Sequence, residues 1–265
     1  MKKIFLIILI AYVINASAQP QTYTVANAHS HNDYENPVPF HTAYNAGFGS
    51  IEADIFLIKG QLIVAHDFAE LKNNRSLEDY YLKPLRLHVQ QNKGHAYPDT
   101  GRSLQMLIDV KTSANTTLAA LIELLKKFPE ITSTNTIQWV ITGNRPADSL
   151  FASFPSFIWF DGLLFKDYTA AALNKVVMMS DDFKSYSSWQ GIDNLPAADK
   201  NKLTDAISRA HALHKKVRFW DAPDNISAWK QFMGLKADYI NTDHIIELAD
   251  YLNRFAGNQP GDKPQ

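Results

Sequence analysis

Two pairs of polar side chains in this sequence have the types and spacing needed for metal-assisted chemistry. His29 and His31 follow the first apolar run, and their spacing places both side chains on one face of a strand. Glu52 and Asp54 have the same spacing within a second apolar run at residues 50–58. Two carboxylates on the inner face of a sheet repel one another and lose solvation, so they need a cation. A hard divalent ion is the natural partner for such oxygen ligands.

Three further residues complete this set. Asp109 ends a third apolar run, and Lys111 follows on the same face, so the two form either a structural ion pair or a metal ligand beside a phosphate-binding lysine. A hairpin turned at Gly60 would return His66 to the neighbourhood of Glu52. An imidazole beside metal-bound carboxylates can donate or accept a proton near neutral pH. The set therefore predicts a metal-assisted phosphoryl-transfer site with an acid–base pair.

The composition excludes several other kinds of site. The 265 residues are 46% hydrophobic and 20% charged, which is typical of a globular protein. The 26 Lys and Arg residues nearly balance the 27 Asp and Glu residues, so we expect no nucleic-acid partner. Cysteine is absent, which rules out disulfides, thiol catalysis and cysteine-based metal sites. Any metal must be held by oxygen or imidazole ligands.

The two ends of the chain are expected to lie outside the folded domain. Residues 1–18 combine two lysines, an apolar run at residues 4–14 and a final Ala-Ser-Ala, which is typical of a signal peptide cleaved before Gln19. That run is shorter than the ~20 residues needed to span a bilayer. The sequence therefore predicts an exported protein, periplasmic or secreted, with no stable membrane anchor after cleavage. Residues 257–265 contain two Pro and two Gly and are predicted to form a flexible tail.

The order of apolar runs favours an α/β fold, a single (β/α)8 TIM barrel over residues 19–256. Strand-like runs alternate with helical patterns, which implies parallel pairing, and ~250 residues is the usual size of this barrel. A small β-hairpin is expected after the second strand, and residues 82–102 are predicted to be an irregular loop that shapes the substrate mouth. We expect helices at residues 116–128 and 197–214, and strands at residues 23–28, 50–58, 104–110, 136–141, 157–160, 175–179, 216–220 and 239–241.

At these residues the sequence resembles the glycerophosphodiester phosphodiesterase and phosphatidylinositol-phospholipase-C-like superfamily of barrels. Ala28-His29 looks like the start of its first histidine motif. Glu52-x-Asp54 followed by Val64-Ala-His-Asp67 is similar to its metal-ligand and second-histidine motifs. Asp109-Val-Lys-Thr112 is similar to a strand of the sphingomyelinase D branch.

The residues of the first motif indicate one subgroup of this superfamily. His29-Ser-His-Asn-Asp-Tyr34 most resembles the altered-inheritance-of-mitochondria-type subgroup, and departs from the His-Arg-Gly usual in glycerophosphodiesterases. Near the C-terminus, Val217-Arg-Phe-Trp220 and Ile240-Asn-Thr-Asp243 look like the last two strands. The resemblance thus spans almost the whole chain after the expected signal peptide.

The resemblance implies a set of roles on a small-molecule phosphodiester. Glu52, Asp54 and Asp109 would bind one divalent cation, Mg²⁺ or Ca²⁺. His29 and His66 would be the acid and base, with His31 supporting His29 or exchanging roles with it. The attacking group would be water or a neighbouring hydroxyl of the substrate, which would give a cyclic phosphate. The expected substrate-binding residues are Asn32, Lys111, Trp220 and Arg145.

Two other functions are compatible with parts of the pattern. His29-x-His31 also looks like the first metal motif of amidohydrolase-like and polymerase-histidinol-phosphatase-like barrels, which bind two transition-metal ions. Such sites need more histidines at strand ends, and the remaining middle histidines do not supply them. A non-catalytic sugar- or lipid-binding barrel would keep a pocket but would not need three carboxylates beside histidines. The identity of the bound metal separates the two enzyme classes.

Overall fold

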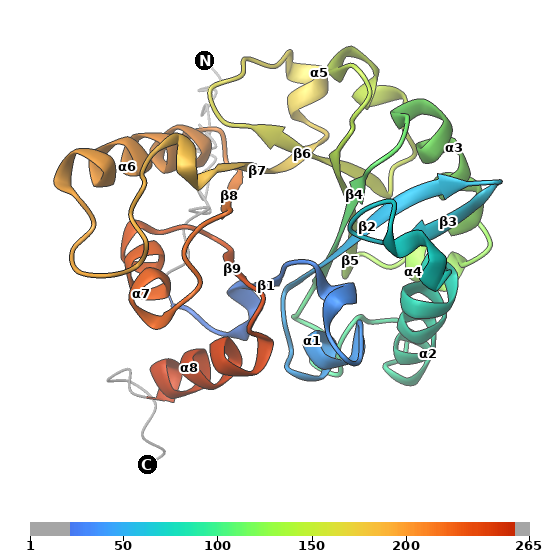
Figure 1. The fold of residues 1–265 in the computed structure, drawn as a ribbon. Coiled ribbons are helices and arrows are strands. Elements are labelled where there is room, and N and C mark those ends of the chain that lie inside the picture. Colours follow the sequence, from blue (N-terminus) through green and yellow to red (C-terminus); the bar gives the residue numbers. More distant parts are fainter. Residues whose placement is uncertain (1–21, 258–265) are drawn as a thin grey trace, which may run out of the picture.

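A nearly closed ring of eight parallel strands forms the centre of the computed structural model, which describes residues 22–257 (Figure 1). The ring order is β8-β7-β6-β5-β4-β2-β1-β9, and a parallel bridge between Arg218 and Tyr239 joins its two ends. The predicted TIM barrel is confirmed. The expected signal peptide and all of the expected tail except Gly257 lie outside the described residues.

The ring strands other than β1 lie close to their predicted positions. β2 and β8 have the predicted bounds, and β4 does as well. β5, β6 and β7 each continue two or three residues beyond the predicted end. The ring strands are β1 (Ala28–Ser30), β2 (Ser50–Ile58), β4 (Leu104–Val110), β5 (Ile137–Gly143), β6 (Ile158–Leu163), β7 (Val176–Asp182), β8 (Lys216–Trp220) and β9 (Ile240–Thr242).

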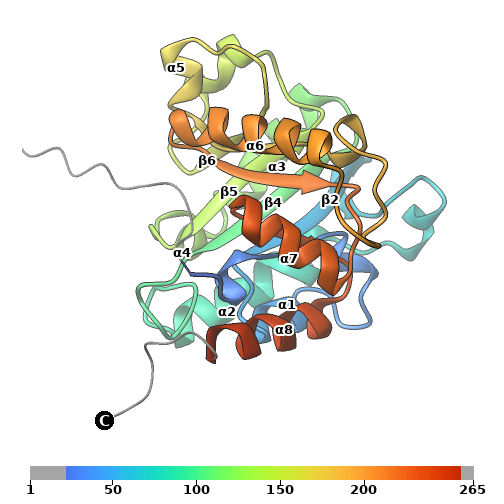
Figure 2. The same ribbon diagram turned by 90° about the vertical axis from the view of Figure 1, so that its left-hand side faces the viewer.

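Helices surround the ring and cover its outer face, and Figure 2 shows α6, α7 and α8 stacked along one side. Within residues 22–257, no helix combines the length and the apolar character that crossing a bilayer requires. The two predicted helices are present as α3 and α6, each a few residues shorter at its C-terminal end. The helices are α1 (His41–Asn45), α2 (Lys83–Gln91), α3 (Ala114–Leu125), α4 (Pro129–Thr132), α5 (Ala170–Leu173), α6 (Ala197–Ala212), α7 (Ile226–Leu235) and α8 (Ile245–Gly257).

The expected hairpin after the second strand is also present. β3 (Gln61–Val64) pairs antiparallel with β2, and Gly60 forms the turn with a φ of +83°. That left-handed backbone favours glycine. The hairpin returns the chain toward the ring, so that His66 comes close to the carboxylate of Asp54.

Alternation along the strands divides the side chains between two environments. Ile51, Ala53 and Ile55 of β2 are fully buried on the outer face, where helices cover them. Their inward neighbours Glu52 and Asp54 are also almost completely buried. A small separate apolar cluster inside the ring consists of Leu107, Val140, Met178 and Tyr239, and its Leu107 is the register partner of Glu52. The polar residues of the site therefore extend from the buried Ser50 and Gln105 to the carboxyl ends of the strands, beside this apolar cluster.

Two segments differ from the expectation. The strand predicted at residues 23–28 is largely wrong, because Thr24 and Asn27 cap a 3₁₀ turn at Val25–Asn27 and the strand begins only at Ala28. Residues 82–102 are not an irregular loop at the mouth, since α2 occupies their first half. Their second half packs at the amino end of the barrel, where the Tyr97 hydroxyl donates to the carbonyl of Phe48 at 2.5 Å.

Candidate active site

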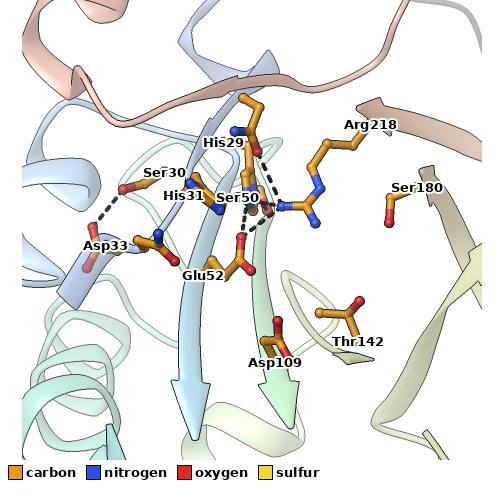
Figure 3. Close-up of polar contacts among 12 residues, drawn as sticks. His29, Ser30, His31, Asp33, Ser50, Glu52, Asp109, Thr142, Ser180 and Arg218 are labelled. Carbon is orange, nitrogen blue, oxygen red and sulfur yellow. Dashed lines mark hydrogen bonds and ion pairs between the residues drawn. The ribbon is translucent and has the colours of Figure 1, made fainter. Parts of the chain in front are cut away.

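A cavity of about 420 Å³ opens at the carboxyl ends of the ring strands. This is the end at which TIM barrels carry their active sites. Figure 3 shows Glu52, Asp109, Thr142, Ser180 and Arg218 reaching toward one another from different strands. Of the ten residues predicted for the site, eight line the cavity: His31, Asn32, Glu52, His66, Asp109, Lys111, Arg145 and Trp220.

Three carboxylates form the most concentrated charge in the site. Asp54 and Asp109 are register partners on adjacent strands β2 and β4, and Glu52 lies one inward position deeper on β2. One oxygen from each of the three carboxylates lies within 4.8 Å of the other two. Gly143 makes room for this cluster, because a Cβ at that position would lie 1.9 Å from Oδ1 of Asp109. The three predicted metal ligands are thus brought together.

The donor set fits a hard divalent cation. Oδ1 of Asp54 and Oδ1 of Asp109 are buried and have no hydrogen-bond partner among the described residues. Burial, with the charges of Glu52 and Asp109, raises the pKa of Asp54 to about 7. Carboxylates that are desolvated, crowded and incompletely hydrogen-bonded need a further positive charge, and oxygen ligands of this kind suit Mg²⁺ or Ca²⁺.

Lys111 supplies one positive charge to the cluster. Its ammonium donates to Oδ2 of Asp54 at 2.8 Å and to Oδ2 of Asp109 at 2.9 Å. Burial alone would lower the pKa of Lys111, but the two carboxylates outweigh it and raise the pKa well above its usual value. The ion pair considered from the sequence therefore exists, and the same ammonium also faces the cavity.

A hydrogen-bond chain orients Glu52 from below. The Gln105 amide donates to the Ser50 hydroxyl at 2.9 Å, and that hydroxyl lies 2.8 Å from Nδ1 of His29. Nε2 of His29 lies 2.7 Å from Oε2 of Glu52. Nε2 of His29 therefore lies between the carboxylate of Glu52 and Nη1 of Arg218, which is 2.6 Å away. Burial and the charge of Arg218 lower the pKa of His29 to about 4, which keeps the ring neutral.

The two histidines of the first motif lie in different places. His29 has no exposed surface and does not line the cavity, whereas His31 lines it with 27% of its side chain exposed. Nδ1 of His31 donates to Oδ1 of Asp243 at 2.8 Å, so its Nε2 carries no protein contact in the described part of the chain. Burial acts to lower the pKa of His31, but the hydrogen bond to Asp243 and the charge of Glu52 outweigh it and raise the pKa.

Tyr34 connects the second histidine to the carboxylates. Its buried hydroxyl lies 2.8 Å from Oδ2 of Asp54, 2.9 Å from Oδ1 of Asn32 and 3.2 Å from Nδ1 of His66. The hydroxyl proton goes to one of the two oxygens, so the phenol oxygen can accept from Nδ1–H of His66. Nε2 of His66 is then available to accept a proton. His66 is half-exposed and lines the cavity.

The turn after β1 is held in one conformation by a buried aspartate. Asp33 accepts hydrogen bonds from the Ser30 hydroxyl at 2.9 Å, the Tyr81 hydroxyl at 2.9 Å and the backbone N–H of Phe40 at 2.5 Å. Asn32 has a φ of +44°, in the left-handed region that asparagine tolerates better than most residues. Asp33 thereby positions both His31 and Tyr34.

Three functional residues were missing from the sequence prediction. Arg218 is almost fully buried on β8, and its Nη1 donates to Oε2 of Glu52 at 2.8 Å. Asp161 is buried on β6 and accepts from the Thr142 hydroxyl at 2.9 Å, and Arg145 donates to its main-chain carbonyl. Asp161 and Arg218 are charged residues in the middle of otherwise apolar runs, a signal that could have identified them. Tyr34 carried no such signal.

Comparison with known protein families gives matches to two parts of the chain, and both parts contribute residues to the site. A profile of the AIM6-like phosphodiesterase domain matches residues 20–153, which is half of the chain. The chain belongs to the AIM6-like phosphodiesterase family. A second profile, of the glycerophosphoryl diester phosphodiesterase family, matches residues 216–246. The AIM6-like match contains both histidine motifs and the carboxylate cluster, and the second match contains Arg218, Trp220 and Asp243.

Relatives of this family cover most of the chain. Altered inheritance of mitochondria protein 6 of Kluyveromyces lactis is 28% identical, with 86% of this chain and 72% of that protein covered. A homolog from Arthroderma benhamiae is 26% identical, with coverages of 74% and 72%. The crystal structure of a glycerophosphodiester phosphodiesterase from Parabacteroides distasonis has a TM-score of 0.55 at 11% identity, covering 87% of this chain and 98% of that one. That likeness supports the barrel fold, and the family indicates phosphodiester hydrolysis.

Replacing Lys111 tests the electrostatic balance of the AIM6-like site. Lys111→Met should lower the free energy of unfolding of the metal-free protein by about 3 kcal/mol, because Asp54 and Asp109 lose their shared counter-charge. Mg²⁺ should raise the melting temperature more in this variant than in the wild type, because a bound cation replaces the ammonium. Thermal unfolding with EDTA and with Mg²⁺ measures both effects.

The control is Lys83→Met, which removes an exposed lysine paired with Glu78 and Asp79. It should leave the melting temperature nearly unchanged under both conditions. An equal loss of stability in Lys111→Met with EDTA and with Mg²⁺ would contradict the expected exchange of ammonium for metal.

Proposed function

We propose that this chain is an exported, metal-dependent phosphodiesterase that uses histidine acid–base catalysis. One observation carries the proposal: three clustered carboxylates, two of which have a buried unpartnered oxygen, lie at a cavity that is also lined by two histidines from different loops. A binding site for a neutral ligand would not need that charge density. Phosphoryl transfer does need a cation and a pair of proton-transfer groups around the reacting phosphate.

Glu52, Asp54 and Asp109 would hold one Mg²⁺ or Ca²⁺ ion. When bound, such an ion would polarise the phosphoryl group and neutralise the charge on its non-bridging oxygens. Lys111 would keep Asp54 and Asp109 in place, and its remaining N–H would donate a hydrogen bond to the substrate. Arg145 and Trp220 line the cavity farther out and would contact the alcohol portions of the diester.

His31 and His66 are the proposed acid–base pair, and His29 is a positioning residue. His31 and His66 both face the cavity, and their Nδ1 atoms are engaged by Asp243 and Tyr34. In each ring this leaves Nε2 for proton transfer. One Nε2 would take the proton from the attacking hydroxyl, and the other would donate a proton to the leaving oxygen. His29 is enclosed and would act by orienting Glu52.

The two alternative functions have less support. For the His-x-His hydrolase, both histidines of the motif would have to ligate metal, yet Nε2 of His29 is used by Glu52 and Nδ1 faces Ser50. The one group of three metal-ligating side chains found in residues 22–257 contains no histidine. A non-catalytic barrel is disfavoured because the same cavity combines the carboxylate cluster with His31 and His66, an arrangement with a cost in stability and no use in binding alone.

Export is proposed from the sequence of residues 1–18. Expression of the chain from Met1 onward should yield a mature protein that begins at Gln19 in the periplasmic or culture fraction. Intact-mass measurement of both the exported and the cell-associated fractions checks this. A full-length chain that retains Met1 and stays inside the cells would refute export without bearing on the chemistry.

The activity should require a hard divalent cation and favour diesters. The protein from Gln19 onward should hydrolyse bis-p-nitrophenyl phosphate faster than p-nitrophenyl phosphate, lose activity in EDTA, and regain it with Mg²⁺, Ca²⁺ or Mn²⁺. Glu52→Gln should lower kcat by about 10²-fold or more, because a neutral amide is a poor ligand for such an ion. Restoration by Zn²⁺ with preference for the monoester would instead favour the His-x-His hydrolase.

The leaving group distinguishes the roles of the two exposed histidines. His31→Asn and His66→Asn should each lower kcat by about 10²- to 10⁴-fold on a diester with an alkyl leaving group, because an alkoxide must be protonated as it departs. With p-nitrophenolate, which needs no proton, the variant that lacks the acid should recover most of its activity. The variant that lacks the base should not. Steady-state kinetics on the two substrates measures the difference.

His214→Asn is the matched control. His214 is exposed at the end of α6, just before β8 and therefore at the amino end of the barrel, and its φ of +55° suits asparagine. This variant should match the wild type on both substrates. Full activity in either His31→Asn or His66→Asn on the alkyl diester would remove that residue from the proposed pair.

A further inference from the structure

Arg218 uses only half of its guanidinium within the protein. Nη1 donates to Oε2 of Glu52 at 2.8 Å and to Oδ1 of Asn241 at 3.3 Å, and it also lies 2.6 Å from Nε2 of His29. Nε is buried and unpartnered, and Nη2 has no acceptor among residues 22–257. Figure 3 shows the free end of the guanidinium directed toward the centre of the barrel, facing Thr142 and Ser180.

A purely structural role does not explain this arginine. Only 3% of Arg218 is exposed, and removing such a charge from water is costly unless its hydrogen bonds are satisfied. Glu52 also has the enclosed ring of His29 beside it, with Nε2 at 2.7 Å from Oε2, as a second contact that orients it. A buried guanidinium that leaves Nε and Nη2 open beside a cavity has donors available for a ligand. Its planar fork suits the oxygens of a phosphate.

The net charge of the site also favours a phosphate contact for Arg218. With a divalent ion bound, the three carboxylates, Lys111, Arg218 and the ion together carry one positive charge. Without Arg218 the total would be zero. A phosphodiester carries one negative charge, so Arg218 makes the loaded site attractive to a diester and lets the bound state be neutral. Neutrality matters here because Glu52 and Arg218 are almost fully buried beside an apolar cluster, where charge is weakly screened.

We infer that Arg218 is a substrate-binding residue whose Nη2 takes a non-bridging oxygen of the phosphodiester held beside Glu52. This inference rests on the proposed function and adds a phosphate contact to it. Lys111 makes a different contact, since its ammonium lies against Asp54 and Asp109. Arg218 would reach the phosphate from β8, beside Glu52.

The inference predicts that metal binding and diester binding respond in opposite directions when Arg218 is changed. Removing a positive charge next to Glu52 should strengthen the binding of a cation by the carboxylates. It should weaken the binding of the diester by about tenfold to hundredfold, as expected for one charge-assisted hydrogen bond. If Arg218 only held Glu52 in place, its loss would disorganise the ligands, and both affinities would fall.

The experiment measures both affinities on the protein from Gln19 onward, without turnover. Binding of Mn²⁺ is followed by its electron paramagnetic resonance signal, and binding of dimethyl phosphate to the Mn²⁺-loaded protein by calorimetry. Arg218→Gln removes the charge, and Arg218→Lys retains it without the fork. Arg254→Gln is the control, because it removes one positive charge from the exposed face of α8 and should change neither affinity.

The expected result in Arg218→Gln is tighter Mn²⁺ binding with weaker dimethyl phosphate binding. Arg218→Lys should bind Mn²⁺ as the wild type does and dimethyl phosphate with intermediate affinity. Unchanged dimethyl phosphate binding, or a parallel loss of both affinities, overturns the assignment of Arg218. Should Arg218→Gln not fold, Arg218→Lys alone decides between the same outcomes. A wild-type protein that binds neither Mn²⁺ nor dimethyl phosphate would contradict the proposed function itself, whatever the variants do.

Discussion

Mutual repulsion among three enclosed carboxylates is the constraint on which the rest of this site depends. Glu52, Asp54 and Asp109 are brought together at the carboxyl end of the barrel, where water is partly excluded. Such a cluster is stable only if positive charge is placed around it. Lys111 and Arg218 contact it from opposite sides, and their two charges leave one negative charge uncompensated. A divalent cation would compensate this remaining negative charge. The site would then carry a net positive charge, which favours a phosphate as its ligand.

The barrel supplies the remaining conditions. An apolar cluster of Leu107, Val140, Met178 and Tyr239 lies beside the charges inside the ring, and it strengthens the electrostatic interactions next to it. Hydrogen bonds from enclosed residues then hold the groups in place. His29 orients Glu52, and the Tyr34 hydroxyl lies between Asp54 and His66. Proton transfer is left to residues that the cavity exposes. His29 and His31 point to the same face of the strand, but His29 lies one layer deeper in the barrel. His29 is therefore enclosed, whereas His31 is exposed to the cavity.

Much of the fold and part of the site followed from local pattern. The bounds predicted for β2, β4 and β8 match those observed, because fully buried strands form continuous hydrophobic stretches in the sequence. The first strand was misplaced because Thr24 and Asn27 cap a turn inside a β-like composition. Residues 82–102 were assigned to the wrong end of the barrel, since polarity alone does not reveal which edge a segment packs against. The three carboxylates were identified because each follows the period of its strand.

The sequence by itself determined which side chains point inward and which strand ends carry acidic or basic groups, because alternation along a strand is a local property of the backbone. Only the tertiary structure decided which of those groups meet. Arg218 contacts Glu52 across 166 positions of chain, and Asp243 holds His31 across 212. These pairings, and the depth that hides His29 while exposing His31, depend on how eight strands close into a ring. Closure is set by packing over the whole domain, which no short stretch of sequence contains.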